Sequence, residues 1–281
     1  MFQKTISKSG FISGIGLHTG ENIEMKISPL ECNSGIVFKR IDIASDNLIE
    51  AKYYNVSDST LCTEIANSNG VSIKTVEHFM AALWGAEIDN ILIEVKGPEI
   101  PAMDGSSKEF MKLLHKVGIK TQSYKKRYLK ILDKIEVTDG DKKIVINNAE
   151  KFSLDFDIEF EHKSIGNQHF RYNGIHDFEK DISEARTFGF TSQLIELQKM
   201  GLAKGASLSN TIALNNDGII NPEGLRDKNE FVKHKILDCM GDLYMSGFKI
   251  IGEIKAHKSS HKLNNAILKK IFDNPKSYRL I

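Results

Sequence analysis

The sequence contains little cysteine and little proline. Its 281 residues include three cysteines and five prolines. No CxxC pair occurs, which argues against a Cys-rich zinc module and against a disulfide framework, and a sparse, odd set of cysteines is typical of a reducing cytoplasm. With so few prolines and no low-complexity tract, we do not expect a disordered chain.

Neither sign of charge dominates, and no apolar run is long. The 38 Lys and Arg residues against 37 Asp and Glu residues leave a net charge of +1, so we expect no nucleic-acid partner. The start of the chain has no apolar core of signal-peptide length. Apolar stretches such as residues 79–84 fall far short of the roughly 18–20 residues of a membrane span. We therefore expect a cytoplasmic monomer with no integral membrane segment.

The order of the segments predicts an α+β protein. A chain of 281 residues suits one large domain or two of roughly 140 residues each. Strands come before helices in each half, which favours layers of sheet and helix over a doubly wound parallel sheet. No internal repeat is visible in the sequence. For the first half, the pattern predicts strands at 21–28, 35–38 and 90–95, and helices at 72–84 and 106–117, with Gly118 as a stop.

In the second half, the Asp139-Gly140 pair predicts a hairpin turn. The other predicted elements are strands at 128–138, 142–147, 152–160 and 248–256, and helices at 191–200, 229–245 and 262–272. Residues 119–127 are polar and basic without an apolar period. We predict a boundary there, which gives domains 1–123 and 124–281. The alternative is a solvated loop inside one domain.

The clearest helix carries a line of polar residues. His234, Asp238 and Asp242 stand at positions i, i+4 and i+8, so they share one stripe of the helix. An imidazole and a carboxylate one turn apart can ligate one cation. The alternative is a solvated polar stripe. Apolar neighbours such as Phe231 and Ile236 indicate instead a buried helix, whose polar groups need partners.

A second signal is the pair Glu77-His78 in an otherwise apolar helix. Adjacent helical residues point about 100° apart, so Glu77 and His78 cannot both bind one metal comfortably and would have separate roles. His78 would act as a metal ligand and Glu77 would reach a water. No second histidine follows as in HExxH, and taken alone such a dipeptide is more often structural.

Taken together, the two signals predict a metal site with His78, His234 and Asp238 as protein ligands and one open position. Three protein ligands and a water are the layout of a catalytic zinc, although Fe²⁺ would fit the same triad. Zinc lowers the pKa of its water and polarises a substrate carbonyl.

The proton transfers need further residues. Glu77 would take the proton of the water. His261 is a candidate acid for the leaving group, and Asp242 is a candidate to hold it as the imidazolium. Among the other histidines, His18 is interpreted as structural and the remainder as surface residues.

Six segments of the chain resemble one known family. They are GIGLHTG, STLCT, TVEHFMAALWGAEIDNILIEVKGPEIPAMDGSS, EARTFGF, FVKHKILDCMGDLYMSG and AHKSSHKLNN. Their order and spacing resemble the LpxC family, the UDP-3-O-acyl-N-acetylglucosamine deacetylases of lipid A biosynthesis in Gram-negative bacteria. The resemblance runs almost from end to end.

The resemblance implies both a reaction and a fold. The reaction is the zinc-dependent hydrolysis of the N-acetyl group of UDP-3-O-(3-hydroxyacyl)-N-acetylglucosamine, a small glycolipid, to acetate and a free amine. The fold is two domains of similar two-layer sheet-plus-helix architecture, with one insert in each and the active site at their interface.

The family motifs also imply roles for ten residues. These are the zinc ligands His78, His234 and Asp238, the general base Glu77, the general acid His261 with its partner Asp242, the oxyanion-stabilising Thr187, the substrate-binding Lys235, and Phe188 and Phe190 in the site lining.

The second insert is expected at about residues 191–221, where the resemblance implies an apolar passage for the acyl chain. Candidate lining residues are the apolar Leu194, Ile195, Leu197, Met200, Leu202, Ile212 and Leu214, and the small Ala203, Ala206 and Ser207. Ordinary core packing is the alternative for such a set. The pair Ala203-Lys204 stands where some family members have bulkier apolar or Cys residues, which leaves the chain-length preference open.

Two other classes of protein remain as alternatives. A metallopeptidase or another zinc amidase would use the same metal chemistry, but the sequence lacks HExxH. A non-catalytic binding protein would close a structural metal site with a fourth Cys or His. Cys239 is a poor fourth ligand, because it adjoins Asp238 and points to a different part of the helix.

Overall fold

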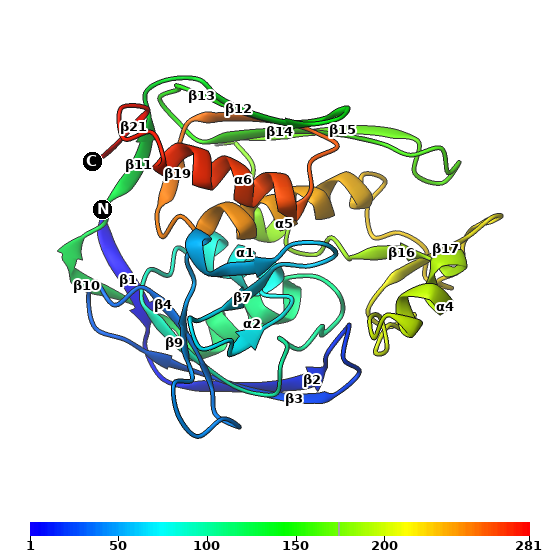
Figure 1. Cartoon of the computed structure of the whole chain (residues 1–281), viewed down its shortest axis with the longest axis horizontal. Helices are drawn as coiled ribbons and strands as arrows, with labels where there is room; N and C mark the ends of the chain where they lie inside the picture. The colour runs from blue at the N-terminus through cyan, green and yellow to red at the C-terminus, as the bar shows by residue number, and fades with distance from the viewer. Residues whose placement is uncertain (174) are drawn as a thin grey trace.

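Two five-stranded sheets enclose two layers of helices. This computed structural model describes residues 1–173 and 175–281. Figure 1 shows the second-half sheet at the top, then α5 and α6, then α1 and α2, with the first-half sheet at the bottom. The predicted α+β class, with two similar sheet-plus-helix domains, is confirmed. The position of the domain boundary stays a prediction.

The first half has the strand order β2-β3-β9-β4-β5. In β3, Ile23, Met25 and Ile27 alternate with more exposed residues and are fully buried against the helices. The elements are β2 Gly10–Ile15, β3 Asn22–Pro29, β4 Ile36–Arg40, β5 Leu48–Glu50, α1 Glu77–Gly85, β9 Ile91–Lys96 and α2 Lys108–Val117. As predicted, α2 stops at Gly118, whose φ of 73° places it in the left-handed region.

The second half has the order β12-β13-β20-β14-β15 and repeats the first topology. In each sheet the last strand in the chain, β9 or β20, runs antiparallel to one neighbour and parallel to the other. The elements are β12 Ile135–Asp139, β13 Lys142–Asn147, β14 Ser153–Glu159, β15 Asn167–Tyr172, α5 Glu230–Tyr244, β20 Glu253–His257 and α6 His261–Phe272.

Each half carries an insert with a small three-stranded sheet. The first-half insert consists of β6 Val56–Asp58, β7 Glu64–Ala66 and β8 Ser72–Ile73. The second-half insert consists of β16 Phe188–Phe190, α4 Thr191–Lys199, β17 Ile212–Asn215 and β18 Gly218–Ile219, and it extends to the right in Figure 1. The remaining elements are β1 Phe2–Ile6, η1 Tyr53–Asn55, β10 Ile119–Lys125, β11 Tyr128–Ile131, α3 Phe178–Asp181, β19 Lys249–Ile251 and β21 Tyr278–Leu280.

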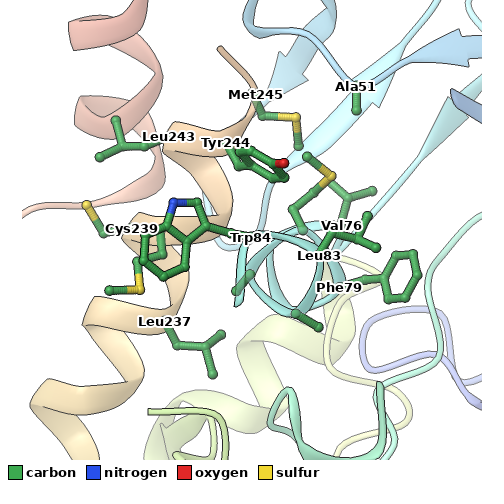
Figure 2. Close-up of a cluster of buried hydrophobic side chains, with 14 of the residues drawn as sticks. Ala51, Val76, Phe79, Leu83, Trp84, Leu237, Cys239, Leu243, Tyr244 and Met245 are labelled. Atoms are coloured by element: carbon green, nitrogen blue, oxygen red, sulfur yellow. The ribbon is translucent and has the colours of Figure 1, made fainter. Parts of the chain in front are cut away.

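Helices α1 and α5 pack closely where the halves meet. Figure 2 shows their apolar side chains in one cluster, with Trp84 from α1 turned toward Leu237 and Leu243 from α5. Gly241 makes the close approach possible. A Cβ at this position would lie 2.0 Å from the backbone oxygen of Glu77, far inside van der Waals contact. The packing therefore brings the start of α1 onto the polar stripe of α5.

Several predicted elements are wrong in their bounds. Residues 119–127 include strand β10, whose partner is β1, so the alternative of a solvated loop there is wrong. The strand predicted at 128–138 breaks into β11 and β12, and the one at 248–256 splits at Gly252 into strands of two sheets. The helix predicted from residue 72 begins at Glu77. Within the described residues, no helix combines the length and the apolar character that a membrane crossing requires.

Candidate active site

Helices α1 and α5 bring three buried side chains together. His78 comes from the first turn of α1, while His234 and Asp238 come from α5, one turn apart. The Asp238 Oδ1 lies 3.4 Å from the His78 Nε2 and 3.3 Å from the His234 Nε2. One donor atom from each residue lies within 4.8 Å of the others. The three side chains that the sequence assigns to the metal therefore converge.

The donor atoms fit a cation placed between them. Among the described residues, the buried Asp238 Oδ1 has no hydrogen-bond partner. The His234 Nδ1 lies 3.1 Å from the Ala185 carbonyl oxygen, and burial lowers the pKa of His234 to about 3, so the neutral ring keeps its Nε2 lone pair free. Two lone pairs facing each other at 3.3 Å repel unless a cation separates them. Ligands about 2.1 Å from a tetrahedral centre lie about 3.4 Å apart, which matches the spacing.

Glu77 lies beside this triad and lines the same cavity. Its Oε2 accepts a hydrogen bond from the backbone N–H of Thr63, at 3.0 Å. Burial raises the pKa of the Glu77 carboxyl above its ordinary value. A raised pKa moves a carboxylate toward the range in which it works as a general base near neutral pH.

His261 and Asp242 form a buried pair across the site. The His261 Nδ1 lies 2.8 Å from the Asp242 Oδ2, which also accepts from the Asn264 amide at 2.9 Å. Burial alone would lower the pKa of His261, but the Asp242 carboxylate, with smaller contributions from Glu77 and Asp238, outweighs burial and raises the pKa to about 9. The His261 Nε2 is 3.9 Å from the Asp238 Oδ2, so the free ring nitrogen faces the candidate metal site.

The substrate-binding residues implied by the motifs lie around one cavity of about 890 Å³. Thr187, Phe188 and Phe190 line it from the segment that enters the second insert. The backbone N–H of Thr187 donates to the Gly105 carbonyl of the first half, at 2.8 Å. Lys235 also lines the cavity, and its Nζ donates to the Asp238 Oδ2 at 2.7 Å. The roles of these residues stay predictions.

The predicted lining of the acyl passage is partly wrong. Leu194, Leu197, Ala203, Ala206 and Ser207 line the cavity, together with Leu208, Ala213 and Ile220. Ile212 and Leu214 are fully buried in β17 and belong to the core, because they point away from the cavity side of that strand. Ile195 and Met200 are exposed to solvent, at 68 % and 64 %, and Leu202 is not among the described lining residues.

Sequence reasoning missed three residues at the site. His18, interpreted as structural, lines the cavity. Thr63 contacts both Glu77 and Asp242. Arg186 is buried beside Thr187, and its Nε lies 2.8 Å from the Glu230 Oε1 at the start of α5. Both Arg186 and Thr63 stand in segments that resemble the family, EARTFGF and STLCT, and that resemblance is a signal that could have identified them, although it does not give their contacts.

The fold and the site define a two-domain α+β protein with a candidate catalytic metal centre at its domain interface. Comparison with known proteins adds the family. The model of the UDP-3-O-acyl N-acetylglycosamine deacetylase family matches residues 3–273. The chain therefore belongs to the UDP-3-O-acyl-N-acetylglucosamine deacetylase family.

Individual relatives agree with the family model, and all three described here carry the name UDP-3-O-acyl-N-acetylglucosamine deacetylase. The protein of Psychrobacter sp. (strain PRwf-1) is 41 % identical, with 100 % of this chain and 95 % of the relative covered. That of Shewanella frigidimarina is 43 % identical, with 100 % and 93 % covered. That of Pasteurella multocida is 43 % identical, with 99 % and 92 % covered.

Proposed function

We propose that this chain is a zinc-dependent deacetylase of lipid A biosynthesis. It hydrolyses the N-acetyl group of UDP-3-O-(3-hydroxyacyl)-N-acetylglucosamine to acetate and a free amine, in the cytoplasm of a Gram-negative bacterium. The names of the relatives support the substrate. A single observation of the structure carries the proposal: the unpartnered Asp238 Oδ1 between two imidazoles, with Glu77 and His261 on the walls of the same cavity.

His78, His234 and Asp238 would hold the metal. When bound, zinc supplies Lewis-acid polarisation of the amide carbonyl and lowers the pKa of water toward about 7. Three protein ligands leave one position open for substrate or water, and this open position distinguishes a catalytic site from a structural one. The metallopeptidase alternative shares the donor set but finds no support in the names of the relatives.

The protein side chains divide the two proton transfers. The Oε2 of Glu77 is occupied by the Thr63 N–H, so its other oxygen takes the proton of the attacking water. His261, held at Nδ1 by Asp242, delivers a proton from Nε2 to the nitrogen of the departing amine. Thr187 lines the cavity with its hydroxyl available to stabilise the developing oxyanion.

The cavity suits an amphiphilic substrate. Lys142, Lys235 and Lys258 are among its lining residues. Lys235 already pairs with Asp238, and Lys258 pairs with Asp141 and Glu159, so a diphosphate would share these two cations with carboxylates. The α4 insert supplies apolar and small side chains, including Leu194, Leu197 and Ala206. Each buried CH₂ is worth about 0.8 kcal/mol, so an acyl chain of about ten carbons would contribute a large part of the binding free energy.

Acetate release from the purified protein tests the proposal. The substrates are the UDP-3-O-acyl-N-acetylglucosamine, the same sugar without its acyl chain, and an N-acetylated peptide. We expect turnover of the first, a much lower kcat/KM for the second and none for the peptide. Metal content is measured on the same sample and distinguishes zinc from Fe²⁺. A protein without bound metal that releases no acetate would support a binding protein, and peptide cleavage would support the peptidase.

A further inference from the structure

Thr63 lies buried where the first-half insert meets both catalytic helices. It stands just before β7, and only 2 % of its surface is exposed. Its backbone carbonyl accepts from the Val76 N–H at 3.2 Å, next to the start of α1. The residue is therefore anchored on the helix that carries Glu77.

Two further hydrogen bonds join Thr63 to the proposed general base, Glu77, and to Asp242, the partner of the proposed general acid. Its backbone N–H donates to the Glu77 Oε2 at 3.0 Å. Its hydroxyl Oγ1 donates to the Asp242 Oδ1 at 2.5 Å. Glu77 belongs to the first half and Asp242 to the second, so one residue fixes two carboxylates across the domain interface.

The hydroxyl completes the hydrogen bonding of Asp242. Its Oδ2 already receives the His261 ring and the Asn264 amide, at 2.8 and 2.9 Å. Its Oδ1 accepts from Thr63, and without that donor this oxygen would be buried and unsatisfied. The contact therefore holds the plane of the carboxylate, and with it the orientation of the His261 ring.

Thr63 acts without touching the substrate. The neighbouring Thr60 and Leu61 line the cavity, whereas Thr63 is absent from the described lining. We propose that Thr63 is a positioning residue that holds Glu77 and the Asp242–His261 pair in the mutual geometry that the two proton transfers require. This inference rests on the proposed function above.

Kinetics of Thr63→Val and Thr63→Ser test the proposal. Valine keeps the shape and the backbone contacts and removes only the hydroxyl donor. Since a hydrogen bond to a charged group is at stake, we expect kcat to fall about 10- to 100-fold, with KM within about twofold. Serine restores the donor, and kcat should return to within about threefold of the wild type. Metal content should match the wild type in both variants.

Thr5→Val is the matched control. The Thr5 hydroxyl is also buried and donates to the Asn90 carbonyl at 2.6 Å, far from the site. The same hydroxyl accepts from the Leu30 N–H at 3.3 Å. Its loss should lower Tm and leave kcat unchanged, which separates lost stability from lost positioning. If the Thr63→Val protein does not fold, Thr63→Cys is used in its place, because a thiol is similar in size to the hydroxyl but is a weak hydrogen-bond donor. We expect the same fall in kcat for this variant.

A second readout does not depend on turnover. The His261 Nδ1 proton, bonded to a carboxylate, should give a downfield ¹H NMR resonance that is absent in His261→Gln. We expect the resonance to persist in Thr63→Ser and to shift or broaden in Thr63→Val.

A resonance unchanged in Thr63→Val overturns the proposal even if the wild type releases no acetate. An inactive wild type with a perturbed resonance in Thr63→Val refutes the proposed function and leaves the positioning intact. In an active enzyme, an unchanged kcat in Thr63→Val, or a serine variant as impaired as the valine variant, also overturns it.

Discussion

Replacing Asp242 by asparagine should move the basic limb of the pH–rate profile. The pKa of the buried His261 is raised from its ordinary 6.5 to about 9 against the effect of burial, with Asp242 as the largest of the carboxylate contributions and Glu77 and Asp238 adding to it. Asparagine keeps the size and an acceptor oxygen but removes the charge. Loss of a neighbouring opposite charge lowers a pKa by about one to two units, so the pKa of His261 should fall toward neutrality.

The sign follows from the role of His261 as an acid. The protonated ring is active, so activity falls as pH rises through its pKa, and a lower pKa starts that fall at lower pH. With a drop from about 9 to about 7.5, the share of protonated His261 at pH 8 falls about fourfold and that at pH 6 hardly changes. The assay measures kcat/KM for acetate release from pH 5 to 10 in the wild type and in Asp242→Asn. The quantity compared is the pH at which the basic limb reaches half of its maximum, not the absolute value of kcat/KM.

Asp155→Asn provides the control for this prediction. Asp155 pairs with His169 on the surface, where the histidine side chain is 56 % exposed. Removing the charge of Asp155 should leave the basic limb of the pH–rate profile at the same pH. A basic limb that does not move in Asp242→Asn would refute the assignment of His261 and Asp242 as a coupled acid pair.

Three further predictions follow from the site. Glu77→Ala should keep the metal and lose about 10²–10⁴-fold in kcat, because it removes proton transfer and leaves the ligands intact; full metal content with near-normal turnover would remove Glu77 from the mechanism. Ala206→Phe should lower kcat/KM for a long-acyl substrate far more than for a truncated one, and equal losses would show that the insert is only packing. Arg186→Gln should leave the buried Glu230, with 1 % of its side chain exposed, without its cation. The free energy of unfolding should then drop by about 3–5 kcal/mol in urea titrations, and a change below about 1 kcal/mol would contradict the ion-pair argument.

The sequence predicted well those helices and spacings that are determined by residues close to one another in the chain. Helix α5 begins and ends within one residue of the predicted 229–245, because a long apolar period is a strong signal. The His234 and Asp238 spacing is likewise local. Strand β10 was missed because its partner β1 lies at the other end of the first half, and its polar sequence carries no alternation.

Contacts between distant segments could not be predicted from the sequence. The shared topology of the two halves leaves no visible sequence repeat, since layers need only apolar faces and not particular residues. Ile212 and Leu214 were assigned to the passage because an apolar residue in a core and one on a cavity wall look alike in a sequence. Thr63 was missed for the same kind of reason: its partner Asp242 is in the other half.

Titration of the metal-free protein with Zn²⁺, followed by acetate release, tests the central claim most directly. If His78, His234 and Asp238 form one catalytic metal site, activity should be absent at the start, rise in proportion to added zinc and level off at one equivalent per chain. His234→Gln should show little or no activity at the same equivalents. Full activity in the metal-free protein, or a His234→Gln variant that titrates like the wild type, would contradict the account.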